Sequence, residues 1–308
     1  MLFRSAAATR SGWSPTLQES ALPLALAVAT IWVVHPLLTE AVTYVVQRAE
    51  SMVGLFYLLT LYCFVRGAAS RSSGVWYACS AIACLLGMAT KEVMVSAPLM
   101  VLLYDRTFVA GSFREAWRQR WPVYAALAST WIVLGYIVMA TASSGGYFAE
   151  APWQSYLVTQ LHAIVRYLRL AVWPDTLVFD YGSPLVGSVR EVAPDALIIV
   201  LLLAGTAVSL WRWRALGFLG AWFFAILAPT SSVIPVAGQT VAERRMYLPL
   251  AAVIAVLVIG TYLLGRKLLK TQPKFGRVLG WGAAGTVALA LTILTDRKST
   301  RLNSSHER

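Results

Sequence analysis

Long apolar runs separated by short polar segments make up most of the chain. The runs cover residues 22–34, 52–65, 75–89, 93–104, 123–140, 197–211, 216–228, 248–265 and 278–295. With their flanks, these runs have lengths typical of helices that enter or cross a bilayer. Aliphatic and aromatic residues form 58% of the sequence, whereas only 13% is charged. A soluble domain carries about twice that charged fraction. The pattern predicts an all-α integral membrane protein with about nine transmembrane helices.

The basic residues indicate how the predicted helices are threaded. The formal net charge is +12, and half of the 26 arginines and lysines lie in short loops at residues 66–71, 105–120, 212–214 and 266–277. Such loops face the cytoplasm in membrane proteins, so we attribute the positive charge to topology and expect no nucleic-acid partner. A single threading places all of these loops inside, provided that residues 153–173 do not cross.

Residues 153–173 differ from the other apolar segments. They contain His162, Arg166 and Arg169 at steps of four and three residues, which would form one basic stripe on a helix. We expect an amphipathic helix that lies in the outer interface or dips partway into the protein. A structural role is expected for His162, because no ligand-like partner lies near it in the sequence.

Four polar segments then share the outer side, at residues 35–51, 90–92, 150–195 and 230–247. In the first, Glu40, Tyr44 and Arg48 recur every fourth residue and would stack on one face of a helix. Arginine binds phosphate as a rigid fork, and a carboxylate can deprotonate a hydroxyl. The candidate site residues are His35, Glu40, Arg48, Glu50, Lys91, Glu92, Asp180, Glu243, Arg244, Arg245 and Tyr247.

Each of these signals also has a simpler interpretation. The first segment could be a juxtamembrane helix whose charges reach water and headgroups, and Glu243 to Arg245 could bind headgroups. Lys91 and Glu92 could form an inert ion pair, and Asp180 could only end a turn. The sequence has no nucleotide-binding motif and no Cys/His zinc pattern, so we expect no metal and assign no cofactor.

Both ends of the chain resemble translated sequencing adapters. Residues 296–306 read DRKSTRLNSSH, and residues 1–5 read MLFRS. We therefore expect residues 1–5 and 296–308 to be artefacts, and residues 6–295 to be a membrane domain truncated at both ends.

Four motifs carry a resemblance to a known family. They are HPLLTEAVTYVVQRAES from His35, TKEVMVSAPLMVLLYD from Thr90, RYLRLAVWPDTLVFDYG from Arg166 and SSVIPVAGQTVAERRMYLP from Ser231. In this order they resemble the membrane half of the O-mannosyltransferases that combine transmembrane helices with tetratricopeptide repeats. That family includes cadherin-glycosylating eukaryotic members and bacterial relatives.

The resemblance implies a GT-C fold that uses a polyprenyl- or dolichyl-phosphate sugar as donor. It implies transfer of the sugar, with inversion, to a protein hydroxyl on the outer side of the membrane. An acidic residue in the family's first outer loop would act as base while arginines hold the lipid phosphate. That acidic loop has no counterpart before Glu40, and the repeats that would help to bind an acceptor protein are missing. We therefore expect this chain to be inactive by itself.

Two alternatives from other functional classes remain. One is a transporter or flippase of a lipid-linked saccharide, and the other is a noncatalytic scaffold for tetratricopeptide repeats. The expected location is the bacterial inner membrane, or the endoplasmic reticulum membrane in a eukaryote, with the active face outward. The expected partners are the bilayer, the lipid-linked sugar and the acceptor protein.

Overall fold

All regular elements that the structure describes are helical. The computed structural model describes residues 19–43, 47–142, 153–174, 192–229, 242–268 and 273–306, and these residues contain no strand. The longer helices are α3 (Ala21–Val33), α5 (Arg48–Ala69), α6 (Ser73–Met88), α8 (Phe113–Ala142), α9 (Trp153–Val172), α10 (Ala193–Arg212), α11 (Arg214–Ala228), α12 (Pro249–Leu268) and α13 (Pro273–His306). The shorter ones are η1 (Pro36–Leu38), α4 (Thr39–Thr43), η3 (Glu92–Ser96), α7 (Ala97–Tyr104), the π-helical turn η4 (Asp105–Val109) and η6 (Glu243–Met246). The predicted all-α class is confirmed.

Four of the described helices are long and apolar enough to cross a membrane. They are α5, the stretch Phe113–Ala140 of α8, α10 and α12. A fifth candidate arises if α3 and the stretch Pro36–Val42, which meet at a bend of 52°, are counted together. The apolar helices α6 and α11 are shorter. The chain is therefore a membrane protein, and the total of about nine crossings stays a prediction.

The predicted span at residues 93–104 is divided between a 3-10 helix and an α-helix, and a π-helical turn follows it. The 3-10 helix η3 leads directly into α7, which is followed by the π-helical turn η4. Pro98 lies in the first turn of α7, where its missing N–H would have no intrahelical partner. Together these elements form a continuous but irregular helical path from one end of the bundle to the other.

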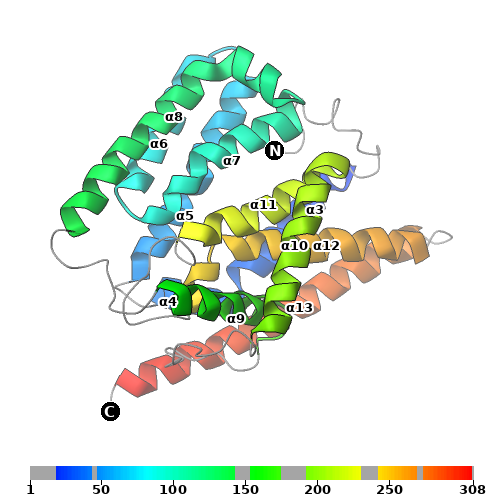
Figure 1. Cartoon of the computed structure of the whole chain (residues 1–308). Coiled ribbons are helices and arrows are strands. Elements are labelled where there is room, and N and C mark those ends of the chain that lie inside the picture. Colours follow the sequence, from blue (N-terminus) through cyan, green and yellow to red (C-terminus); the bar gives the residue numbers. More distant parts are fainter. Residues whose placement is uncertain are drawn as a thin grey trace.

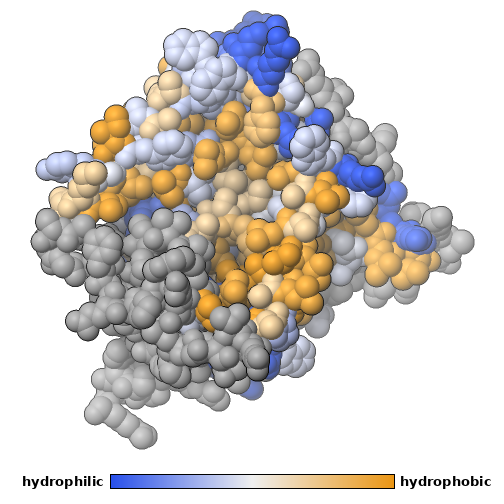
Figure 2. Space-filling model, in the orientation of Figure 1, coloured by the Kyte–Doolittle hydropathy of each residue, from blue (hydrophilic) through white to orange (hydrophobic). Residues whose placement is uncertain are grey.

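The helices pack as neighbouring hairpins. α5 packs on α6 and α6 on α8, while α11 lies between α10 and α12, and α12 contacts α3. Figure 1 shows α6, α7 and α8 on one side of the molecule, with α10 and α12 on the other. Gly217 permits the tight α10–α11 hairpin, because a Cβ atom there would collide with the backbone of Leu210. Figure 2 shows apolar side chains over the middle of this face of the molecule.

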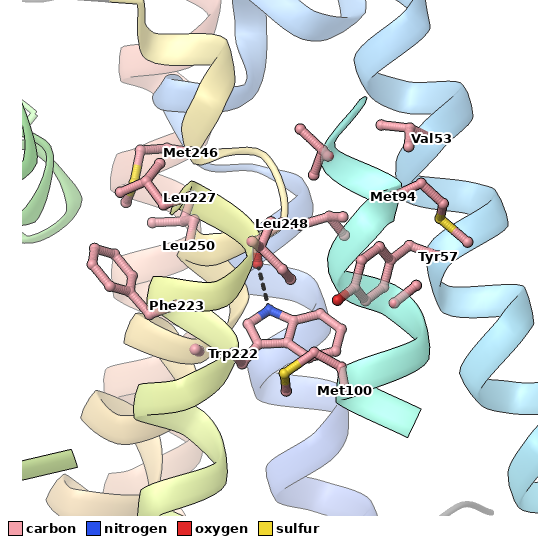
Figure 3. Close-up of a cluster of buried hydrophobic side chains, with 14 of the residues drawn as sticks. Val53, Tyr57, Met94, Met100, Trp222, Phe223, Leu227, Met246, Leu248 and Leu250 are labelled. Atoms are coloured by element: carbon pink, nitrogen blue, oxygen red, sulfur yellow. Dashed lines mark hydrogen bonds between the residues drawn. The ribbon is translucent and has the colours of Figure 1, made fainter. Parts of the chain in front are cut away.

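A cluster of apolar side chains joins the two groups of helices (Figure 3). Tyr57 of α5 packs edge-to-face on Trp222 of α11, with ring centroids 5.2 Å apart. The Tyr57 hydroxyl lies 3.0 Å from the Ser96 hydroxyl, and the Trp222 indole N–H donates to the Leu248 carbonyl at 2.9 Å. The polar tips of these buried rings are thus satisfied. Met246 belongs to the same cluster, so this core lies directly against η6.

A buried polar network ties the helices together at one end of the bundle. Arg120 of α8 donates to both carboxylate oxygens of Asp105, at 3.0 and 2.9 Å, and to the Tyr77 hydroxyl at 3.2 Å. Tyr124 also donates to Asp105, whose exposed fraction is 0%. The sequence places Asp105 in a basic loop that follows a span, and the structure buries its side chain there. The carboxylate is a buried crosslink, in which bonds from one guanidinium nitrogen of Arg120 and from the Tyr124 hydroxyl offset desolvation.

Candidate functional site

Glu40 and Arg244 form an ion pair between α4 and η6. The Arg244 guanidinium donates to the Glu40 carboxylate at 2.6 Å, and the Arg244 backbone N–H donates to the other oxygen at 3.3 Å. The side chains are 3% and 12% exposed, respectively. The carboxylate thus fixes both the side chain and the backbone of Arg244.

A second ion pair joins Glu50, near the start of α5, to Lys91, the residue before η3. The two side chains are 5% and 19% exposed. The charge of Glu50 also interacts with those of Arg244 and Glu92. Glu40, Arg244, Glu50 and Lys91 therefore form one group of alternating charges, which we name the acid–base cluster. Three of the four predicted polar segments meet in it.

The three charged residues of η6 contact three different parts of the chain. Glu243 pairs with Lys298 of α13, Arg244 pairs with Glu40 of α4, and Arg245 donates to Gln160 of α9 at 3.1 Å. A 3-10 helix has 3.0 residues per turn, so successive side chains point about 120° apart. Arg244 and Arg245 therefore point to different partners and do not form one joint binding site. Of the two, Arg244 is the one that belongs to the acid–base cluster.

His35 holds the bend after α3 in place. Its Nε2 lies 3.2 Å from the Ala171 carbonyl, and its Nδ1 accepts the Leu37 backbone N–H at 3.2 Å. A carbonyl only accepts and an amide only donates, so the ring is neutral with its proton on Nε2. His35 thereby links this bend to the end of α9. Neither of these two bonds goes to a residue of the acid–base cluster.

Tyr247 lies against α3 and α5. Its ring packs edge-to-face on Trp32, with centroids 5.2 Å apart, and its carbonyl accepts the Trp32 indole N–H at 2.8 Å. The ring also covers Gly54, where a Cβ atom would collide with it. Tyr247 therefore positions the end of η6 on the helix that carries Glu50.

Some sequence-based expectations for this region are corrected by the structure. Glu40 and Arg48 belong to different helices, so they do not form one helical stripe, and Arg48 is exposed. Tyr44 and Asp180 lie outside the described residues. Glu92 is half-buried in η3 and does not pair with Lys91, which binds Glu50 instead.

The amphipathic helix α9 contributes residues that the sequence did not single out. Gln160 binds Arg245, and the Tyr167 hydroxyl accepts the Ala242 backbone N–H at 2.7 Å. Both lie on the buried face of α9, seven residues apart and so two helical turns. On the exposed face, His162 pairs with Asp195 of α10 at 2.7 Å, which supplies the partner that the sequence did not reveal. The signal in the sequence is the seven-residue spacing of Gln160 and Tyr167, which places them on one face of a helix.

The polar string at residues 296–306 continues α13 as a helix. Lys298 is 8% exposed; besides pairing with Glu243, it donates to the Pro36 carbonyl at 3.1 Å. Thr295 donates to the Val34 carbonyl at 2.7 Å. The segment that was set aside as adapter sequence thus supplies the cation beside Glu243. Residues 1–5, set aside in the same way, are outside the described part of the chain. Within that part, no group of three His, Cys, Asp or Glu residues could hold a metal ion.

Two relatives resemble parts of this chain. Protein O-mannosyl-transferase Tmtc2 of Drosophila melanogaster is 32% identical over 178 residues, which is 51% of this chain and 18% of the relative. Protein O-mannosyl-transferase tmtc2 of Xenopus laevis is 36% identical over 75 residues, or 23% of this chain and 9% of the relative. The chain thus matches less than a fifth of the length of either relative. No family model and no solved structure matches it.

Proposed function

We propose that this chain is part of a membrane glycosyltransferase that moves a sugar, mannose, from a polyprenyl-phosphate donor to a protein hydroxyl. The names of the two relatives support the reaction class. The acid–base cluster is the observation that supports the proposal at the level of residues. In it, Glu40 binds Arg244 and Glu50 binds Lys91. These cations come from segments 153 residues apart in sequence (244 − 91), and the charges of both interact with Glu50.

The proposed chemistry requires a cationic place for the leaving group. The acceptor oxygen forms a bond to the anomeric carbon, the bond from that carbon to the phosphate oxygen breaks, and a carboxylate takes the acceptor's proton. The departing lipid phosphate carries the negative charge. Arg244 and Lys91 are the described cations placed to bind it, and guanidinium–phosphate bonds are strong because both partners are charged.

Glu40 and Glu50 give this site its selectivity for an anion. Each carboxylate holds one cation in a mostly buried position, so a phosphate must compete with it. Breaking a buried pair without replacing the lost charge costs about 3–5 kcal/mol, whereas an incoming phosphate supplies a new anionic partner. A neutral lipid offers no such replacement and would not open the pairs.

The proposal is tested on the complete natural protein that contains these residues. The purified protein is incubated with polyprenyl-phosphate mannose and an acceptor peptide, and both mannosylated peptide and free lipid phosphate are measured. Arg244→Ala should lower the rate at least tenfold, because one charge-assisted contact to the leaving group is lost. Arg71→Gln, an exposed change outside the cluster, is the control and should leave the rate unchanged.

The same assay separates the alternatives. A transporter or flippase would move the donor between leaflets without releasing lipid phosphate. The position of the charges at helix ends, instead of midway along the spans, disfavours that path. A scaffold would show neither release nor movement, and Arg244→Ala would then have no effect on either signal. The endoplasmic reticulum or the bacterial inner membrane as location, with the cluster facing outward, belongs to this proposal.

A further inference from the structure

The first part of α8 carries a stripe of exposed aromatic side chains. Phe113, Trp117 and Trp121 recur every fourth residue and are 50%, 55% and 55% exposed. Phe113 and Trp117 lie on one face of the first turns of α8, and Trp121 directly follows the non-helical residue Arg120. Large exposed aromatic groups in a row require an apolar or interfacial environment, so this face is not built for bulk water.

Two arginines lie beside this stripe. Arg114 and Arg118 follow the same four-residue spacing, and both are exposed. The Arg118 side chain is 76% exposed and donates to Glu115 at 2.9 Å. We name Phe113, Arg114, Trp117, Arg118 and Trp121 the basic–aromatic belt.

A kink in α8 lies within the belt, between Arg118 and Trp121. Arg120 has non-helical backbone angles (φ −137°, ψ 24°), and Pro122 follows inside the helix. The Arg120 side chain at this kink is bound by Asp105 and Tyr77. The angle between the part of the belt before the kink and the part that begins at Trp121 is therefore fixed by the contacts of Arg120.

The belt lies at the end of the bundle opposite to the acid–base cluster. Glu50 is near the start of α5, whereas the Tyr77 ring that binds Arg120 covers Gly67 near the end of α5. The α10–α11 turn lies at the same end as the belt, because Arg214 donates to the Gly111 carbonyl at 2.8 Å. Trp211 and Trp213 in this turn are 82% and 62% exposed. Figure 2 shows hydrophilic residues gathered at the top of the view, over the segment that joins α7 to α8 in Figure 1.

We infer that the basic–aromatic belt binds the headgroup layer of anionic phospholipids, in the leaflet opposite to the acid–base cluster. Tryptophan side chains favour the headgroup level of a bilayer, where an apolar ring meets polar surroundings. Arginines at that level attract anionic lipid, and the attraction adds to the burial of the aromatic face. A soluble acidic protein would match the charge, but it would not account for four exposed tryptophans at the end of apolar helices. This inference does not depend on the proposed enzymatic function.

The test uses the full chain in lipid nanodiscs of phosphatidylcholine that contain a small fraction of brominated lipid, which quenches nearby tryptophan fluorescence. Brominated phosphatidylglycerol should quench more than brominated phosphatidylcholine at the same fraction. The expected local enrichment of the anionic lipid is on the order of tenfold for two basic residues at the surface. Trp117→Phe/Trp121→Phe should remove most of the excess quenching, which identifies the belt as its source.

Matched arginine variants separate belt binding from a general charge effect. Arg114→Gln/Arg118→Gln should abolish the preference for the anionic lipid, and Arg114→Lys/Arg118→Lys should keep it. Arg48→Gln, which removes a charge at the other end of the bundle, should also keep it. Equal quenching by both brominated lipids in the unmodified chain would overturn the inference. So would unchanged quenching in the Trp117→Phe/Trp121→Phe variant, because the belt would then face a protein partner or water.

Discussion

The carboxylate of Glu40 accepts a side-chain bond and a backbone bond from Arg244, which follows it by 204 residues in the sequence. The two oxygens of one buried carboxylate thereby hold a guanidinium and the start of a 3-10 helix. Neither residue could keep this position alone, because each would leave a buried charge without its partner.

Removing either member of this pair should destabilise the protein, and removing both should cost less than the sum. We expect Glu40→Gln and Arg244→Gln each to lower the free energy of unfolding in detergent by about 2–4 kcal/mol. The coupling energy in the double-mutant cycle should be about 1–3 kcal/mol. Arg48→Gln is the control, since this side chain is exposed, and should change stability by less than about 0.5 kcal/mol. Strictly additive losses would contradict the pairing.

Asp105→Asn should weaken the end of the bundle that carries the basic–aromatic belt. The variant keeps the shape of the side chain but removes the charge that Arg120 and Tyr124 bind, so we expect a loss of about 3–5 kcal/mol. Arg118→Gln affects an exposed pair and should cost at most about 1 kcal/mol. Thermal unfolding followed by tryptophan fluorescence measures both. A small effect of Asp105→Asn would show that water reaches the Asp105 carboxylate.

Lys298→Met tests whether the tail of α13 stabilises the site. Glu243 is 1% exposed, so loss of the Lys298 ammonium should destabilise the protein by about 3 kcal/mol. Glu243→Gln in the Lys298→Met background should recover part of this loss, because the buried negative charge is then gone. If Lys298→Met leaves the unfolding temperature unchanged, residues 296–306 do not contribute to the fold, as their resemblance to adapter sequence predicts.

Two glycine-to-alanine changes should have opposite effects. In Gly54→Ala the new methyl group would meet the Tyr247 ring, which must then move with the end of η6. We expect a destabilisation of about 1–3 kcal/mol and, in the complete protein, a lower rate of sugar transfer. Gly135→Ala in α8 meets nothing within 4 Å and should be neutral or stabilising by up to about 1 kcal/mol. Loss of stability in Gly135→Ala would contradict the open space around that glycine.

The sequence predicted the helices well because an apolar run of this length inside a membrane has to satisfy its own backbone hydrogen bonds, and a helix does so. It also predicted that the segments around Glu40, Lys91 and Arg244 share one end of the bundle, since the charge of the loops orients all the spans together. These residues meet, through Glu50, in the acid–base cluster.

The pairings themselves could not be predicted from spacing. Glu243, Arg244 and Arg245 are adjacent in the sequence, but the 3-10 geometry of η6 directs them to α13, α4 and α9. Asp105 has the sequence environment of an exposed basic loop, yet the kink at Arg120 turns a guanidinium onto it. Such outcomes depend on which helices become neighbours, and the periodicity of one helix carries no information about the next.

The 3-10 turn at residues 243–246 has a mechanical consequence. Its three charged side chains leave one short turn, and Glu40 binds the backbone N–H of Arg244 as well as its side chain. A phosphate that replaced Glu40 at both of these groups would release the backbone of the turn, which also carries the contacts of Arg245 with Gln160 and of Glu243 with Lys298. Occupancy of the anion site would therefore be transmitted to α9 and α13, two helices that no donor phosphate has to touch.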